Sequence, residues 1–421
     1  MKFGAARSEI VFPRLFLPTE GFTQQISSLY ARVFVLENSV DADRFAFLSL
    51  ELTSLPDANV DELKRLLSVV TGAEVQKSWV SVSHTFSVPH LILPNLSMTE
   101  EQVRKNQQFF CAIRKATEDA AKRATEALQN VSVSFGQAQC AVNANRDIET
   151  PDGWWIGTNG LGFSDKTLSV FCFNTEENNP VGIIIIYSIQ SSIFDGASLS
   201  DGGRPVSSDL AGAVCQSFEE EHTGSVAFFI PGAAGDQAPI KKAIDFVIAE
   251  DGTVEIVDSS MQAPLFLKTL SVVMSSALKD TLPLTKVLND PSFGLSSIRF
   301  SVPGKRMARD LKLLRPTRNY AYVADGEREI TVEMLRIGSI RLLGVKPELN
   351  AKTLAQLQER SPFRYTLIVT MINGGAKYMA DTDSYDRMTY EAMNSPFGQG
   401  AAEMFVEKAA EMLKEAYQES I

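Results

Sequence analysis

The sequence is poor in the residue types that build metal sites and disulfide frameworks. Its 421 residues include only three histidines and four cysteines, and no two cysteines form a CxxC pair. The wide spacing of the cysteines argues against a disulfide framework and against a cysteine-ligated zinc site. We therefore expect Cys111, Cys140, Cys172 and Cys215 to be buried free thiols.

Long apolar runs are also scarce. The longest, residues 181–187 and 226–230, are much shorter than the ~20 residues that cross a bilayer. The N-terminus lacks a basic start followed by an apolar stretch and a small-residue cleavage site, which is the pattern of a secretory signal. These features predict a cytoplasmic protein without a transmembrane segment.

Basic residues are outnumbered by acidic ones. The chain has 40 Lys and Arg against 51 Asp and Glu, a formal net charge of −11. The Lys and Arg residues are scattered and form no basic segment, which argues against nucleic acid as a partner. Hydrophobic residues make up 44% and charged residues 22%, a composition typical of an ordered globular protein.

Strand and helix patterns alternate along the chain. Residues 29–36 and 44–50 are rich in β-branched and aromatic residues and flank a turn-like segment, which predicts a β-hairpin. Periodicity predicts a helix at 60–70, and a long polar helix at 99–129 begins with a capping box of Thr99 and Gln102. Further strands are expected at 131–142, 168–173, 182–190, 225–230, 297–302, 330–343 and 365–371, and further helices at 209–221, 263–277 and 399–416.

This alternation predicts a mixed α/β fold in which mixed β-sheets are flanked by helices. The sequence contains no internal repeat, no low-complexity tract and no long Gly/Ser-rich or Pro-rich linker. Residues 1–421 are therefore expected to form a single domain.

Two of the three histidines lie in one short segment, residues 81–90, directly after an apolar strand. Loops that follow strands are common places for functional sites. Pro89 prevents His84 and His90 from sharing one face of a regular helix, but a loop could bring both to one metal ion. Histidines held by structural hydrogen bonds are the alternative.

A buried strand runs into a glycine-rich turn over residues 228–239. The glycines allow positive φ angles, and a run of free N–H groups could hold an oxyanion. The alternative, which the pattern alone favours, is a tight turn capped by Asp236. Two further segments, residues 346–348 and 377–378, indicate by pattern no more than loops after strands.

Several short motifs occur in the order in which one known family has them. They are GAARSEI at residues 4–10, LYARVFV at 29–35, HTFS at 84–87, NR at 145–146, FSD at 163–165, GDQAP at 235–239, KPE at 346–348 and KY at 377–378. On these motifs the chain resembles the catalytic domain of the neutral/alkaline non-lysosomal ceramidases, over nearly the whole of that region. The resemblance implies the ceramidase catalytic-domain fold.

In that family two histidines, a glutamate and a tyrosine hold a zinc ion that activates water for hydrolysis of the ceramide amide bond. The resemblance implies that His84, Glu348 and Tyr378 are zinc ligands. It also places the arginine that contacts substrate at Arg146. A further functional tyrosine, twelve residues after the metal tyrosine, falls on Tyr390.

Other family positions are changed. The second zinc histidine corresponds to Gln190, the second histidine of the first loop to Phe86, and a serine of the glycine turn to Ala238. The apolar replacements should make the pocket drier, and Gln is a poor zinc ligand. Because zinc prefers nitrogen and sulfur ligands, we expect weak binding unless His90 supplies a second imidazole. The chain ends at residue 421, so the C-terminal β-sandwich of full-length ceramidases is expected to be absent.

Three hypotheses follow. The first is a metal-dependent amidohydrolase that acts on a small-molecule or lipid-like amide or ester other than ceramide, with a bound water as nucleophile. The second is a non-catalytic binding protein that keeps the fold and the pocket. The third is a hydrolase in which Asp236 or Glu348 acts as general base without metal. All three expect one pocket to contain His84, Arg146, Gln190, Asp236, Glu348 and Tyr378.

Overall fold

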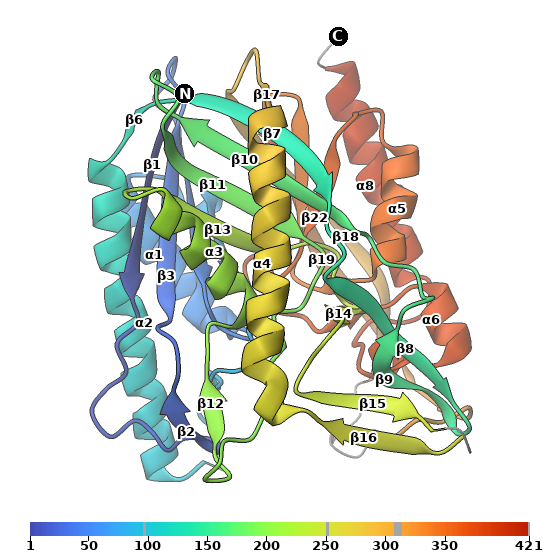
Figure 1. Ribbon diagram of the computed structural model, residues 1–421. Coiled ribbons are helices and arrows are strands. Elements are labelled where there is room, and N and C mark those ends of the chain that lie inside the picture. The colour runs from blue at the N-terminus through green and yellow to red at the C-terminus, as the bar shows by residue number, and fades with distance from the viewer. Residues whose placement is uncertain (96–97, 250–251, 307–313, 420–421) are drawn as a thin grey trace.

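Three larger β-sheets and their flanking helices make up the computed structural model of this chain, which describes residues 1–95, 98–249, 252–306 and 314–419 (Figure 1). The first sheet has the strand order β5-β4-β3-β1-β6. Its strands are β1 (Lys2–Glu9), β3 (Tyr30–Glu37), β4 (Arg44–Leu50), β5 (Ser78–Val82) and β6 (Gln129–Asn130). β3 and β4 pair antiparallel, which confirms the predicted hairpin, and β5 pairs parallel with β4.

Helices α1 (Asp57–Thr71) and α2 (Glu100–Glu126) cover the outer face of this sheet. α2 begins at the predicted capping box. Thr99 Oγ1 accepts a hydrogen bond from Gln102 N at 3.2 Å, and Thr99 N donates to Gln102 Oε1 at 2.8 Å. This reciprocal pair satisfies two backbone N–H groups at the helix start that have no partner within the helix.

The second sheet has the order β13-β11-β10-β7-β17. Its strands are β7 (Ser132–Gln139), β10 (Thr167–Asn174), β11 (Pro180–Tyr187), β13 (Val226–Pro231) and β17 (Lys286–Val287). β11 and β13 are parallel, and α3 (Asp209–Glu221) and α4 (Ala263–Thr281) pack on the outer face. β11 ends three residues before Gln190, so this residue lies in a loop and not at the end of the predicted strand.

The third sheet has the order β18-β19-β20-β22 and is covered by α5 (Ala351–Arg360) and α8 (Ala401–Gln418). Its strands are β18 (Phe293–Lys305), β19 (Ala324–Ile337), β20 (Ile340–Gly344) and β22 (Thr366–Val369). The single strand expected at residues 330–343 is instead part of β19 followed by β20. The chain reverses at Gly338, whose φ of 55° suits a residue without a β-carbon.

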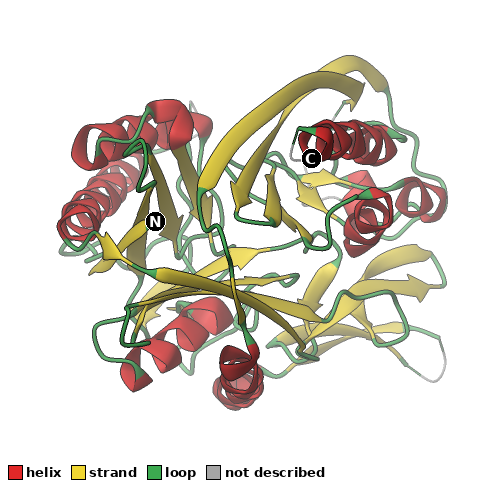
Figure 2. Cartoon of the chain, turned by 90° about the horizontal axis from the view of Figure 1, so that it is seen from above, coloured by secondary structure: helices red, strands yellow, loops and turns green. Residues whose placement is uncertain are grey.

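Aromatic side chains fill the space where the three sheets meet. Phe34 of the first sheet makes an edge contact with Phe228 of the second, with ring centroids 5.0 Å apart. Phe45 contacts Phe293 of the third sheet at 6.1 Å. In β11, Ile184 faces this shared core whereas its neighbours face α3 and α4, as the two-residue period of a strand buried on both faces requires. Viewed from above, the helices lie at the periphery and the strands between them (Figure 2).

The remaining strands form smaller sheets, several of which lie at the lower end of the molecule in Figure 1. The strands are β2 (Phe22–Gln25), β8 (Asn143–Thr150), β9 (Gly153–Asn159), β12 (Arg204–Val206), β14 (Gln237–Pro239), β15 (Ile244–Ile248), β16 (Val254–Asp258), β21 (Glu348–Leu349) and β23 (Tyr378–Met379), and the helices are α6 (Thr382–Arg387) and α7 (Tyr390–Met393). The strand expected at residues 131–142 is shorter in the structure, where β7 ends at Gln139. β8 and β9 form a hairpin that we did not predict from the sequence.

One stretch in the described part of the chain, Ser260–Leu284, is long and apolar enough to cross a membrane by length and composition, with 25 residues and a mean hydropathy of 1.2. It includes α4, which packs against the second sheet through Leu270 and Met274 while leaving Leu265 and Val272 exposed. The sequence expectation, based on uninterrupted apolar runs, did not identify this stretch.

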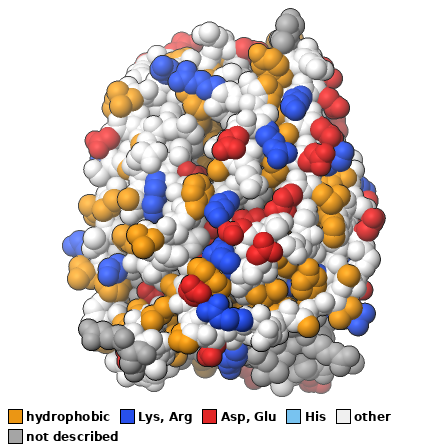
Figure 3. Space-filling view, turned by 90° about the vertical axis from the view of Figure 1, so that its right-hand side faces the viewer, with side chains coloured by type: hydrophobic (Ala, Val, Ile, Leu, Met, Phe, Trp, Pro, Cys, Tyr) orange, Lys and Arg blue, Asp and Glu red, His pale blue; other side chains and the backbone are white. Residues whose placement is uncertain are grey.

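The distribution of charge on one face and the burial of three of the four cysteines agree with the sequence expectations, whereas Cys111 does not. On the face that carries α5, α6 and α8, acidic and basic side chains are intermixed (Figure 3). All four cysteines are free thiols. Three are buried as expected, and Cys111 is exposed.

Candidate functional site

The predicted site residues lie close together, at the carboxyl ends of strands that pair parallel with a neighbour. His84 follows β5, Gln190 follows β11, and Glu348 and Tyr378 follow β20 and β22. Parallel strands present their carboxyl ends at one edge, which is where open α/β sheets commonly place their sites. A short parallel pairing of β21 with β23 then sets Glu348 opposite Tyr378.

His84 is buried in an unusual backbone conformation, with a φ of 54°. Such an angle is costly for a residue with a β-carbon and persists only where the surroundings impose it. Its Nδ1 lies 2.6 Å from the carbonyl oxygen of Thr53, so this nitrogen is the donor. Its Nε2 lies 3.0 Å from Glu348 Oε2. The ring of Phe86 packs against the imidazole at a centroid distance of 4.6 Å.

Gln190 bridges a cation and an anion. Its Oε1 accepts a hydrogen bond from Arg146 Nη1 at 2.7 Å, and its Nε2 donates to Glu348 Oε2 at 2.6 Å. A guanidinium has only donors, so the amide must present its oxygen to Arg146. Its nitrogen, which carries no available lone pair, therefore faces Glu348.

Arg146 is paired with a residue that sequence reasoning missed. Its Nε and Nη2 lie 2.7 and 2.6 Å from Glu391 Oε1, and both side chains are buried. The guanidinium carbon lies 5.2 Å from the ring centre of Tyr378 and 5.7 Å from that of Tyr390. The only sequence signal for Glu391 is its position directly after a predicted functional tyrosine.

The charges at the site reinforce one another. Burial works against the charged form of His84, but the charge of Glu348 and the hydrogen bonds with Glu348 and Thr53 outweigh it and raise the pKa of the imidazole. Burial would raise the pKa of Glu348, but His84 and Arg146 hold it below its usual range. Burial strongly raises the pKa of Tyr378. The pairing therefore favours the charged forms of His84 and Glu348, whereas burial favours the neutral phenol of Tyr378.

Asp236 stands next to this group but is fully engaged by the backbone and by Asn145. Its Oδ1 accepts from Ala351 N, at the start of α5, at 2.9 Å, and its Oδ2 accepts from Asn145 Nδ2 at 3.0 Å. Burial raises its pKa to about 6. The side chain therefore caps the start of α5, whereas the alternative interpretation had it cap its own glycine turn. Ala238, two residues on, is buried in β14 opposite Ala144 of β8.

His90 does not join the group, contrary to the expectation that it replaces the missing imidazole. Its side chain is 41% exposed, and Nδ1 pairs with Glu20 Oε2 at 2.7 Å. Its backbone N–H also donates to the Glu20 carboxylate. The carboxylate of Glu20 therefore holds the imidazole at the surface.

The side chains that are present do not fit a zinc ion. In the part of the chain that the structure describes, no three His, Cys, Asp or Glu side chains are grouped so that they could hold a metal. Gln190 directs a nitrogen without a lone pair toward Glu348, and the buried Tyr378 keeps its proton. His84 and Glu348 are left as the two remaining metal-donor side chains, and two donors are fewer than the four that zinc takes.

Comparisons with known proteins bear on the fold. No protein-family description and no curated protein matches the sequence. Among solved structures, the neutral ceramidase from Pseudomonas aeruginosa matches with a TM-score of 0.73 and 17% identity, covering 98% of this chain and 74% of that one. A ceramidase complexed with C2 matches with a TM-score of 0.73 and 16% identity, covering 100% of this chain and 75% of that one. The chain therefore has a neutral ceramidase-like fold, as the motifs predicted.

Proposed function

We propose that this chain is a ligand-binding protein built on the ceramidase fold and that it does not hydrolyse its ligand. The observation that supports this proposal is the Gln190 amide, which joins Arg146 to Glu348 at the position where the resemblance implies a zinc histidine. The amide replaces a metal ligand with a hydrogen-bonding bridge. Within the described residues, His84 Nε2 and Glu391 Oε2 are buried without a hydrogen-bond partner, so ion pairing with Glu348 and Arg146 holds them in the group.

The charge balance of the group supports the same proposal. The cations His84 and Arg146 lie against the anions Glu348 and Glu391, and all four side chains are buried. A general base needs a free lone pair within reach of the proton that it removes. Asp236 is held by Ala351 N and Asn145 Nδ2, and Glu348, the other proposed base, is paired with His84 and accepts from Gln190, contacts that lower its pKa and weaken it as a base. This arrangement also argues against hydrolysis by a metal-free general base.

Half-buried aromatic side chains surround the polar group and offer a surface for a ligand. Phe86 packs on His84, and Tyr390 contacts both Tyr378 and Trp155, at ring distances of 6.0 and 5.5 Å. Aromatic rings with polar groups beneath them are typical of small-molecule sites. We propose a small-molecule or lipid-like ligand at this position.

Zinc analysis of three proteins tests the proposal. Wild-type protein expressed with zinc and then desalted should contain far less than one zinc per chain. Gln190→His, which adds the second imidazole, should contain more, and Gln190→Ala, which adds space without a ligand, should not. A full equivalent of tightly held zinc in the wild-type protein would overturn the proposal.

A metal-dependent amidohydrolase is the second candidate, and the orientation of His84 favours it. A histidine that donates Nδ1–H to a backbone carbonyl and directs Nε2 toward a carboxylate has the arrangement common for metal-ligating histidines. This candidate function requires the hydrogen bond between Gln190 Oε1 and Arg146 to break, so that Oε1 can turn toward the metal ion. It predicts about one zinc per wild-type chain, lost in His84→Ala, together with hydrolysis of N-acyl amides that a chelator abolishes.

A further inference from the structure

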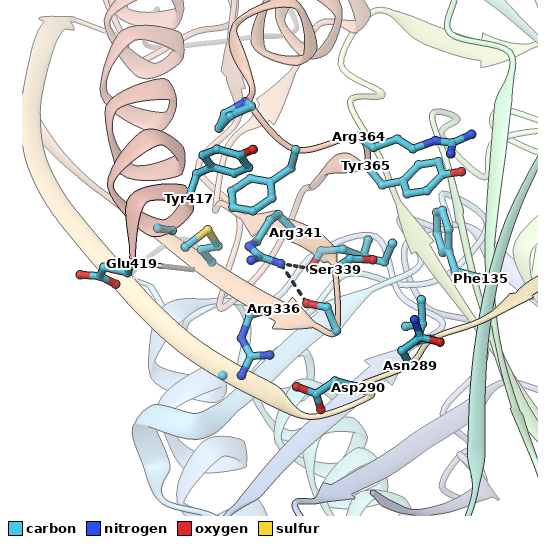
Figure 4. Close-up of a pocket in the computed structure, with 18 of the residues that line it drawn as sticks. Phe135, Asn289, Asp290, Arg336, Ser339, Arg341, Arg364, Tyr365, Tyr417 and Glu419 are labelled. Carbon is cyan, nitrogen blue, oxygen red and sulfur yellow. Dashed lines mark hydrogen bonds between the residues drawn. The ribbon is translucent and has the colours of Figure 1, made fainter. Parts of the chain in front are cut away.

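A cavity of about 1000 Å³ lies apart from the buried polar group of His84, Arg146, Gln190 and Glu348, and no residue is common to the two (Figure 4). It lies between the edge of the second sheet and the third sheet. β7 and β17 contribute to one side, and the β19–β20 turn, the segment before β22 and the end of α8 contribute to the other. The volume lies within the range of small-molecule sites, up to roughly 1,000 Å³.

Arg341 is a buried cation in this cavity without an acidic partner. The residue is 4% exposed. Its Nη1 donates to the carbonyl oxygens of Gly338 and Ile340 at 3.0 and 3.3 Å. Within residues 1–95, 98–249, 252–306 and 314–419, Nε has no hydrogen-bond partner and no carboxylate lies within 4.0 Å of the guanidinium. A buried charge of this kind is costly unless something pairs with it.

A second arginine adds to the positive charge. Arg336 lines the same cavity and donates from Nη1 to Ser292 Oγ at 3.1 Å. Burial, and after it the charge of Arg336, lowers the pKa of Arg341 to about 10, so the guanidinium stays charged at neutral pH. Four basic and two acidic side chains line the cavity, in a protein whose net charge is −11. The two acidic side chains, Asp290 and Glu419, lie apart from each other at the margin of the cavity in Figure 4.

The remaining lining is largely aromatic and aliphatic. The guanidinium carbon of Arg341 lies 3.9 Å from the ring centre of Phe363, so the planar cation is stacked and held in one orientation. Phe135 of β7 contacts Tyr365 at a ring distance of 4.9 Å and extends the apolar wall, and the guanidinium carbon of Arg364 lies 5.0 Å from the ring centre of Tyr365. Cation and apolar wall therefore lie side by side in one cavity.

We propose that this cavity binds an amphiphilic anion. The carboxylate or phosphate head supplies the charge that Arg341 lacks, and the apolar body lies against Phe135 and Tyr365. A planar guanidinium suits oxyanions because its donors match two of their oxygens. The inference is independent of the proposed function, since the two sites share no residue.

Calorimetric titration with an octyl series tests the proposal. Octanoate and octyl phosphate should bind about tenfold or more tightly than octan-1-ol, because a hydrogen bond to a charged group contributes that much. Octylammonium should bind no better than the alcohol, and inorganic phosphate alone should bind more weakly than octyl phosphate. Comparison of the carboxylate with the phosphate distinguishes the two head groups.

Variants assign the effect to Arg341. Arg341→Met should remove the preference for octanoate over octan-1-ol, while its thermal midpoint without ligand should equal or exceed that of the wild type because an unpaired buried charge is removed. Arg341→Lys keeps the charge without the planar fork and should retain part of the preference. Arg299→Met, at an exposed position of β18, is the matched control and should bind like the wild type.

Several results would overturn the proposal. These are equal affinity of the wild type for octanoate and octan-1-ol, an unchanged preference in a folded Arg341→Met variant, or inorganic phosphate binding as tightly as octyl phosphate. If Arg341→Met does not fold, the proposal is decided by the wild-type series together with Arg341→Lys.

Discussion

Arg146 Nη1 and Gln190 Oε1 are 2.7 Å apart, and this hydrogen bond determines which atom of the amide faces Glu348. In isolation, a glutamine in place of a zinc histidine could offer its oxygen to a metal ion. With Arg146 beside it, the oxygen is occupied and the nitrogen is turned inward. The consequence of the substitution at residue 190 therefore depends on its neighbour as much as on the glutamine itself.

The first prediction concerns the pair of Arg146 and Glu391. Arg146→Met should lower the free energy of unfolding by about 3–5 kcal/mol, because it leaves a buried carboxylate without its cation. The double variant Arg146→Met/Glu391→Gln should recover part of this loss. Urea unfolding measures both, and Arg299→Met, in an exposed ion pair with Glu329, should change stability by less than about 1 kcal/mol. A loss equally small for Arg146→Met would contradict the pairing.

The second prediction concerns pH. The pKa of His84 is raised in the folded state, so its stabilising contribution is complete below the unfolded value of about 6.5 and is lost as pH rises through the folded value. The wild type should therefore lose more stability between pH 6 and pH 9 than His84→Gln does. Denaturant unfolding at both pH values measures this, with the surface variant His90→Gln as control. Parallel pH profiles for the wild type and His84→Gln would contradict the ion pair.

The third prediction concerns ceramide. The resemblance implies that Phe86 and Ala238 stand where the ceramidases have polar residues, and Gln190 where they have a zinc histidine. The unmodified protein should release no sphingosine from a short-chain ceramide, as measured by chromatography with an active neutral ceramidase as the assay control. Release by the wild type that disappears in His84→Ala would show that these replacements do not abolish the reaction.

The fourth prediction concerns the start of α2. Thr99→Ala should cost about 1 kcal/mol in urea unfolding, because it removes the oxygen that accepts from the backbone of Gln102. Thr99→Ser keeps that oxygen and should remain close to the wild type. An equal loss for both variants would mean that the methyl group of Thr99 matters and that the cap does not.

Local features of the sequence were sufficient for much of the fold. Alternating β-branched and aromatic residues predicted the β3–β4 hairpin, and Thr99 with Gln102 predicted the start of α2. Both depend on interactions between residues close in the chain. The β8–β9 hairpin was missed, and the β19–β20 turn was read as continuous strand. Both reversals carry turn residues, Pro151-Asp152 in the first and Gly338-Ser339 in the second, so the local signals were present but were not used.

The residues of the candidate site also separate into those that the sequence predicted and those that it missed. The motifs nominated His84, Gln190, Glu348 and Tyr378, and the structure brings them together, but their roles remain predictions. His90 was placed incorrectly because its partner, Glu20, lies 70 residues away in the sequence. Glu391 was missed because its partner, Arg146, lies 245 residues away. No local pattern records either pairing.

The sequence by itself determined the alternation of strands and helices and the neutral ceramidase-like fold, because these depend on periodicity, caps and short motifs. Only the tertiary structure decided that Gln190 is held by Arg146, that His90 lies at the surface and that Arg341 is buried without an acidic partner. The reason is that the orientation of an amide, the burial of a charge and the choice of an ionic partner depend on side chains from distant strands. Those side chains become neighbours only when the sheets pack.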